Sequence, residues 1–146
     1  MRAFWTALAV VLLPSVSAGQ QKQVIQLPGT PPGLPFSTAV RVGDVLYLSG
    51  QIGTLPETGQ LVPGGIRAET RQTLENIKRT LEQIGSSMDR VFKCTVFLAD
   101  MADYAAMNEV YRTYFPVDPP ARSTVAGSGL AFGARVEIEC LALAGK

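Results

Sequence analysis

The spacing of apolar residues changes from helical to alternating in the middle of this chain, and that change restricts the folds it can adopt. From Ile66 to Gly85 the spacing is helical, with Glu, Lys and Arg between the apolar positions and the glycine as a natural C-cap. The helical positions are Leu74, Ile77, Leu81 and Ile84. The next segment, "RVFKCTVFLAD", alternates, and Cys94, Val96 and Leu98 fall on one face of a predicted strand. A helix followed directly by a strand requires layers, with the helix covering a sheet.

The flanking segments supply the other elements. "FSTAVRVGDVLYLSGQIG" predicts a β-hairpin about the turn Gly43-Asp44, and a short edge strand at 24–27 precedes it. A second helix begins after Asp100 or Asp103 as its N-cap. Its apolar stripe is Tyr104, Met107, Tyr111, Tyr114 and Phe115, which we interpret as core and interface side chains. Two strands, "ARSTVAG" and "ARVEIECLAL", end the chain.

These segments predict the order β-β-α-β-α-β-β, in one α/β (α+β) domain with a single mixed sheet. Strand–helix–strand connections are right-handed, so we expect both helices on one face of that sheet. In the last strand, Val136, Ile138 and Cys140 are expected under the helices, with Glu137 and Glu139 on the uncovered face. An uncovered face that carries Leu, Tyr and Val side chains predicts a partner subunit.

The N-terminal segment has the composition of an export signal. "MRAFWTALAVVLLPSVSAGQ" holds a basic residue, Arg2, then a short apolar run and the small residues of "VSA". This pattern predicts a signal peptide over residues 1–18, cleaved after Ala18, and a secreted or periplasmic protein. A membrane anchor, the alternative, needs a longer apolar run. Residues 19–35 then form a polar lead and a Pro/Gly-rich loop, and residues 36–146 form the domain.

Charge and residue types exclude several classes of function. The chain has 13 basic residues, 12 acidic residues and no histidine. Loss of Arg2 with the signal leaves 12 of each, and a neutral surface argues against nucleic-acid binding. Without histidine there is no Ser-His-Asp or Cys-His catalysis, and two cysteines cannot build a clustered zinc site. We expect no metal, no cofactor, no nucleic-acid partner, and no membrane contact after signal cleavage.

The two cysteines, Cys94 and Cys140, are predicted on the helix-covered side of their strands. An exported protein meets oxidising conditions, so a disulfide is open to them if the two strands are neighbours. Because cross-strand geometry is restrictive, we expect buried free thiols instead.

The segment "PPARSTV" is the strongest candidate for chemistry. Its two prolines force extended backbone and deliver Arg122 at the start of a strand, on a rigid base. A guanidinium offers a planar fork that suits a carboxylate, which a lysine ammonium does not. On spacing alone, a solvated surface arginine is the more common outcome.

Three quoted segments together resemble the Rid/YjgF family, in which 2-iminobutanoate/2-iminopropanoate deaminase is the named activity. They are "VGDVLYLSGQIG", "ETRQTLENIKRTLEQIGSSMDRVFKCTVFLADMADYAAMNEVY" and "PPARSTV" with "VEIEC" after it. The resemblance covers 36–143 in the family's order. It implies a chorismate-mutase-like fold, a homotrimer with clefts between subunits, and a small-molecule substrate without a cofactor.

The resemblance also implies roles for single residues. Arg122 would bind the substrate carboxylate, and Glu137 would orient or activate water. Asn108, in "MNEVY", and Gly50, in "SGQI", would line the cleft. From the residues alone, Asn108 could be solvated, Gly50 could mark a strand end, and Glu137 could pair with a basic residue on a neighbouring strand.

Two positions of the expected substrate site depart from the family. Phe36 stands where the deaminases often have tyrosine, so one hydroxyl is lost. Thr124 stands where many have cysteine, and it keeps a hydroxyl. The loop "AGSGLAFGAR" also lacks the proline and lysine usual before the last strand.

The resulting hypothesis is hydrolytic deamination of small 2-imino or enamine acids to 2-oxo acids and ammonia. The alternative is a non-catalytic trimer that binds a small carboxylate or acts on client proteins like a chaperone. RNA cleavage, also attached to the family, ranks last because the sequence has no basic patch.

Overall fold

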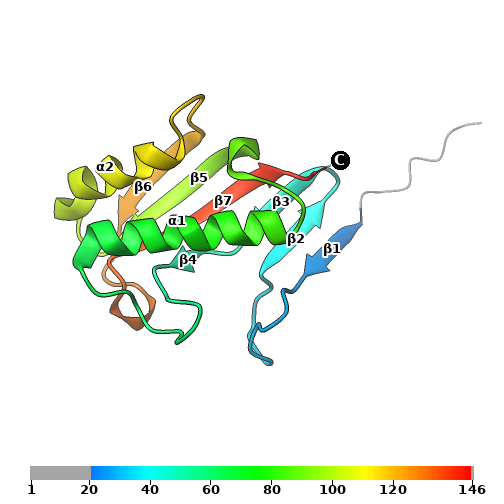
Figure 1. Cartoon of the computed structure of the whole chain (residues 1–146), viewed down its shortest axis with the longest axis horizontal. Coiled ribbons are helices and arrows are strands. Elements are labelled where there is room, and N and C mark those ends of the chain that lie inside the picture. Colours follow the sequence, from blue (N-terminus) through cyan, green and yellow to red (C-terminus); the bar gives the residue numbers. More distant parts are fainter. Residues whose placement is uncertain (1–20, 146) are drawn as a thin grey trace, which may run out of the picture.

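The hairpin and both strand–helix–strand units predicted from the sequence are present, and together they build one mixed sheet (Figure 1). The computed structural model describes residues 21–145. The strands are β1 Lys22–Ile25, β2 Ala39–Val42, β3 Val45–Leu48, β4 Gln51–Ile52, β5 Val91–Leu98, β6 Ala121–Ala126 and β7 Val136–Leu143. The helices are α1 Gly65–Gln83 and α2 Tyr104–Tyr114, with short 3-10 turns at Met88–Arg90, Met101–Asp103 and Ala131–Gly133.

The strand order is β1-β2-β3-β7-β5-β6, and β4 pairs with β7 beyond the end of β3. Only β5 and β6 run parallel, with Cys94 opposite Arg122. The predicted sheet and its two helices are thus confirmed, and the structure adds β4 to the predicted strands. The edge strand β1 begins at Lys22, two residues before the predicted start.

The core lies between the sheet and α1 and α2. Leu74, Ile77 and Leu81 of α1 are fully buried, as the helical spacing predicts. Gly85 ends α1 with a positive φ of 77°, and the Ser86 amide donates to the Leu81 carbonyl. Strands β5 and β7 contribute seven fully buried side chains to this core: Cys94, Val96, Leu98, Val136, Ile138, Cys140 and Ala142.

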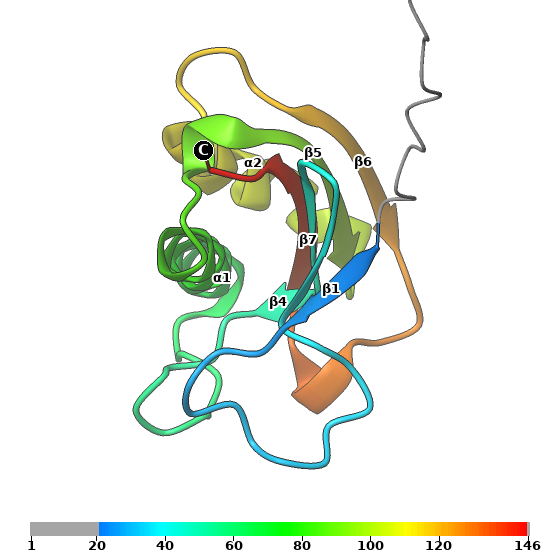
Figure 2. The ribbon, with the colours of Figure 1, turned by 90° about the vertical axis from the view of Figure 1, so that its right-hand side faces the viewer.

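The opposite face of the sheet carries no α-helix within residues 21–145; Figure 2 shows α1 and α2 on the same side. Tyr47 pairs with Leu141 across β3 and β7 on this face and is 46% exposed. Val125 of β6 lies in register with Phe97 and is also exposed. The apolar, uncovered face predicted from the sequence is therefore present. No helix in the described part of the chain is both long and apolar enough to cross a membrane.

Cys94 and Cys140 form a disulfide, and the expectation of buried free thiols was wrong. The two residues lie directly opposite each other on β5 and β7, with 4.1 Å between their Cα atoms. This distance is near that of a non-hydrogen-bonded antiparallel pair, about 4.5 Å, where facing side chains approach most closely. The register of β5 against β7 therefore places the two cysteines close enough for a cross-strand bridge, a condition that the sequence alone does not determine.

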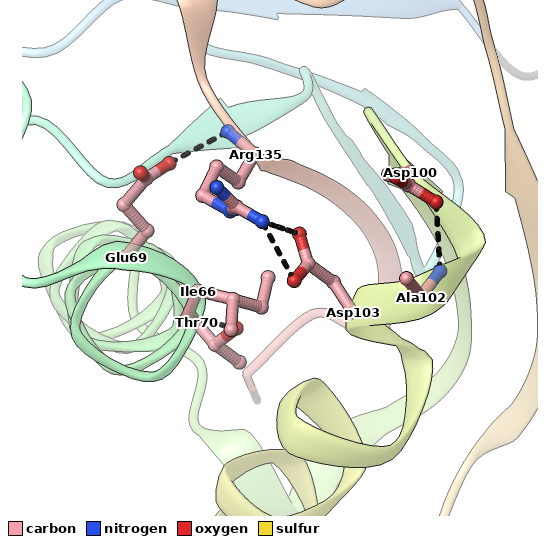
Figure 3. A network of polar contacts seen from close by, with 7 residues as sticks. All are labelled: Ile66, Glu69, Thr70, Asp100, Ala102, Asp103 and Arg135. Atoms are coloured by element: carbon pink, nitrogen blue, oxygen red, sulfur yellow. Dashed lines mark hydrogen bonds and ion pairs between the residues drawn. The ribbon is translucent and has the colours of Figure 1, made fainter.

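A network of one half-exposed arginine and two buried carboxylates fixes the start of β7 to α1 and to the turn that leads into α2 (Figure 3). The Arg135 guanidinium donates from Nε and Nη2 to the two carboxylate oxygens of Asp103, each at 2.9 Å. The Arg135 backbone amide donates to Glu69 Oε2 of α1 at 2.7 Å. Asp103 is 7% exposed and Glu69 is 6% exposed. Of the two predicted caps, Asp103 occupies the N-cap position of α2, but its side chain serves this network and makes no capping hydrogen bond. Asp100 caps the preceding 3-10 turn, where its side chain accepts from the Ala102 amide.

Asp103→Ala is expected to lower the free energy of unfolding modestly, because it removes both acceptors of the Arg135 guanidinium, and solvent already screens this half-exposed cation. Asp103→Asn, which keeps the side-chain size and one acceptor, is the matched control and should cost less. Urea unfolding measures both values. An alanine variant as stable as the wild type would show that Arg135 is equally well solvated without its partner.

Candidate functional site

Arg122 lies on the helix-covered face at the second residue of β6. Pro119 and Pro120 precede this strand, and their fixed φ values set the direction in which β6 leaves α2. Cys94 is the register partner of Arg122 on β5, so the guanidinium leaves the sheet on the side of α2. The predicted placement of this arginine at a strand start is confirmed.

Side chains of α2 surround the Arg122 guanidinium. Its carbon Cζ lies 4.6 Å from the ring centroid of Tyr111 and 5.8 Å from that of Tyr104. Its Nη2 donates to the Tyr104 hydroxyl at 3.4 Å, and Nη1 lies 4.0 Å from the Met107 sulfur. Within residues 21–145 no carboxylate forms an ion pair with Arg122. The charge is therefore held by aromatic faces.

A cavity of about 340 Å³ opens beside Arg122. Its lining consists of Asn108, Tyr111, Arg112, Phe115, Pro119, Pro120 and Arg122. Two of these side chains are guanidinium groups and none is acidic, so the cavity suits an anion. Burial raises the pKa of Tyr111 to about 12 although the Arg122 charge acts in the opposite direction, so Tyr111 stays a neutral phenol at ordinary pH.

Gly50, Glu137 and Phe36 line a second and larger cavity, of about 840 Å³. Gly50 joins β3 to β4, and any Cβ at this position would overlap the carboxylate of Glu137. A side chain at this position would displace the Glu137 carboxylate, the flexible end of that side chain, so Gly50 leaves room for this carboxylate at the cavity. Phe36 is 55% exposed at this cavity. Phe132 also lines this cavity; it is 88% exposed and has a positive φ of 57°, which is strained for a bulky residue.

The structure divides the predicted site residues into these two groups. Arg122 lies in register with Cys94 of β5, which faces the helices, whereas Glu137 lies opposite Phe97, three residues further along the same strand. Because side chains alternate along a strand, Arg122 and Glu137 project from opposite faces of the sheet. They lie two strands apart and three residues apart along the sheet, or roughly 14 Å by strand geometry. Thr124 lines neither cavity, and its Oγ1 is buried without a partner among the described residues.

Sequence reasoning missed the aromatic surroundings of Arg122. Tyr104, Met107 and Tyr111 lie at i, i+3 and i+7 on one face of α2, a pattern that was interpreted as core and interface packing. Neither Glu137 nor Glu139 forms an ion pair within residues 21–145, so the cross-strand pairing left open from the sequence is not found. In the same part of the chain, no group of three acidic or cysteine side chains could hold a metal ion.

Comparisons with known proteins match almost the whole described domain. The family model described as Endoribonuclease L-PSP matches residues 30–144. A mouse protein named 2-iminobutanoate/2-iminopropanoate deaminase is 46% identical over 111 residues, which cover 76% of this chain and 82% of the mouse protein.

Solved structures agree in fold as well as in sequence. The crystal structure of RidA from an Antarctic Psychrobacter is 39% identical with a TM-score of 0.76, covering 83% of this chain and 98% of that protein. The structure of TdcF from E. coli with bound serine is 33% identical with a TM-score of 0.75, at the same coverage of 83% and 98%.

Proposed function

The chain belongs to the family described as Endoribonuclease L-PSP, and from this premise we propose that it hydrolyses small 2-imino or enamine acids to 2-oxo acids and ammonia. The observation that carries the proposal is the Arg122 cavity, which holds a guanidinium that has no acidic partner among the described residues. Two relatives support the substrate class. The mouse protein is named for this reaction, and TdcF was crystallised with serine, which carries the same α-carboxylate.

The reaction requires only positioning and charge stabilisation. The carbon of a C=N group is already electrophilic, so water adds there, the C–N bond breaks, and nitrogen leaves as ammonia while the water oxygen stays as the carbonyl. Arg122 binds the carboxylate through its planar fork. Glu137 holds the attacking water, accepts its proton and returns it to the nitrogen, so that ammonia can leave.

One copy of the chain does not bring these two groups to one small acid, given the separation of roughly 14 Å across the sheet. We therefore place the site between two copies in a homotrimer, with Arg122 from one and Glu137 from its neighbour. The uncovered sheet face that carries Tyr47, Val125 and Leu143 supports such an assembly, because each of these side chains is more than 40% exposed.

The direct test generates 2-iminopropanoate enzymatically in the presence of residues 19–146 and measures the rate of imine loss. We expect a rate well above that of spontaneous hydrolysis, proportional to protein concentration. Saturable binding of 2-oxobutanoate without any increase in imine loss would instead favour the non-catalytic carboxylate-binding alternative.

The mature chain is expected to be a trimer at micromolar concentration, because the exposed apolar face needs a partner and each site needs residues of two copies. Light scattering coupled to size exclusion measures its mass. A monomer that hydrolyses imines would contradict the shared site.

Export is the other part of the proposal. The signal peptide over residues 1–18 lies outside the described residues, so its support is the composition of that segment, together with the Cys94–Cys140 disulfide, a bond typical of oxidising compartments. The protein isolated from its host should begin at or near Gly19, as measured by intact mass. Folded protein that retains Met1 in the cytoplasm would contradict export.

A further inference from the structure

We propose that Tyr111, with Tyr104 beside it, is a positioning residue that holds the Arg122 guanidinium in the orientation that receives a carboxylate. This inference rests on the proposed function, and it assigns to α2 a role that neither the fold nor the cavity requires by itself. It is carried by the contacts of Arg122 with the two rings, by the burial of Tyr111 and by the absence of an acidic partner of Arg122 within residues 21–145.

Aromatic faces can hold an arginine without using its hydrogen-bond donors. An aspartate or glutamate would occupy the same N–H groups that a substrate carboxylate needs. A ring face attracts the cation through its quadrupole and leaves the N–H edges available. With Cζ at 4.6 Å from the Tyr111 centroid, the guanidinium lies within the range of such an interaction. The two polar contacts on Tyr104 and Met107, at 3.4 and 4.0 Å, are long and use only part of the donor set.

Tyr111 is rigid enough to serve as this support. It is 5% exposed, and its ring packs against Phe115 with 4.8 Å between centroids and an interplanar angle of 40°. Its hydroxyl is buried and has no partner among the described residues, so ring packing rather than a hydrogen bond fixes its orientation. Tyr104 is 41% exposed and sits further from Cζ, so it makes the smaller contribution.

An unsupported arginine side chain would sample many rotamers and would lose that freedom when a carboxylate binds. The support removes part of this cost before binding. Its loss therefore weakens substrate binding, whereas the proton transfer at Glu137, which the neighbouring copy contributes, is unaffected. The expected signature is a higher KM with kcat nearly constant.

The kinetic test compares Tyr111→Leu, which removes the aromatic face, with Tyr111→Phe, which keeps it. We expect Tyr111→Leu to raise KM for 2-iminopropanoate roughly three- to thirty-fold, the range of one partly desolvated cation–π contact. Tyr111→Phe should recover most of that loss. Equal effects of the two substitutions would overturn the proposal.

A double-mutant cycle shows whether the ring acts through Arg122. If it does, Tyr111→Leu has little further effect on kcat/KM once Arg122→Ala is present, because nothing remains to be positioned. If the factors by which the two single substitutions lower kcat/KM multiply in the double variant, Tyr111 has an independent, structural role and the proposal is overturned. Tyr104→Ala, at an exposed position, repeats the cycle should Tyr111→Leu not fold.

A second readout does not depend on activity. The Nε–H group of Arg122 is observable by ¹⁵N relaxation, and we expect it to be ordered in the wild type and in Tyr111→Phe but mobile in Tyr111→Leu. An ordered Arg122 in a wild type that hydrolyses no imine would reject the proposed function and keep the positioning. An Arg122 equally mobile in all three proteins would reject the positioning alone.

Discussion

Arg122→Ala is expected to lower kcat/KM for 2-iminopropanoate by about ten- to a hundred-fold. The substitution removes a charge-assisted pair with the substrate carboxylate, worth roughly 1.5–3 kcal/mol, and each 1.36 kcal/mol corresponds to about ten-fold in rate. The effect on folding should be small, because Arg122 forms no ion pair in the described chain and lies on an edge strand. Imine hydrolysis measured at substrate concentrations far below KM gives the value directly.

Arg122→Lys separates charge from geometry at the same position. A lysine ammonium keeps the positive charge but cannot form two parallel hydrogen bonds, and it stacks less well on Tyr111, so we expect it to recover only a small part of the activity. Arg112→Ala, at the other guanidinium of this cavity, is the control for general electrostatic attraction. An alanine variant at position 122 that is folded, trimeric and fully active would contradict the proposed binding of the carboxylate.

Apolar spacing predicted most of the fold, because each element buries a face whose period is visible in the sequence. Leu74, Ile77 and Leu81 lie under the sheet as their spacing requires, and Glu137 faces away from the helices as strand alternation requires. The strand β4 was missed since its two residues give no period. The cysteine bridge was missed because it depends on the register of β5 against β7, which spacing along one strand does not determine.

The candidate site was predicted in its parts but not in its arrangement. Gly50 lies next to the Glu137 side chain, and Arg122 and Asn108 line the same cavity. In each pair the two residues come from neighbouring strands or from a strand and the helix beside it. The sequence could not show that Arg122 and Glu137 leave the sheet on opposite faces. Nor could it show that Tyr111 faces the guanidinium, because an aromatic stripe on a helix has the same spacing whether it meets a core or a cation.

Removal of the Cys94–Cys140 disulfide is expected to lower the free energy of unfolding by about 4 kcal/mol. The bridge joins residues 46 apart in sequence, and closing a loop of this length restricts the unfolded chain by about that amount. For a domain of this size the melting temperature should fall by roughly 10–20 °C. Reduction of the native protein should be slow, because both cysteines are fully buried between the sheet and the helices. Unfolding measured in the presence of a reductant, after the protein has first been denatured and reduced, should then show the full decrease in the free energy of unfolding.

Two preparations separate the bridge from the packing of its sulfur atoms. Wild-type protein refolded with a reductant keeps both sulfurs without the bond, and Cys94→Ala with Cys140→Ala removes both. If the cross-link provides most of the stability, the reduced wild type loses nearly as much as the double variant. If packing dominates, the stability of the reduced protein stays close to that of the oxidised one, since the small cavities arise only in the double variant.

Thiol titration of the protein unfolded without reductant should find no free thiols, and two free thiols per chain would restore the free-thiol interpretation. Imine hydrolysis should survive in both preparations at 25 °C, because Arg122 is positioned by the rings of α2 and Glu137 lies on the opposite face from the bridge.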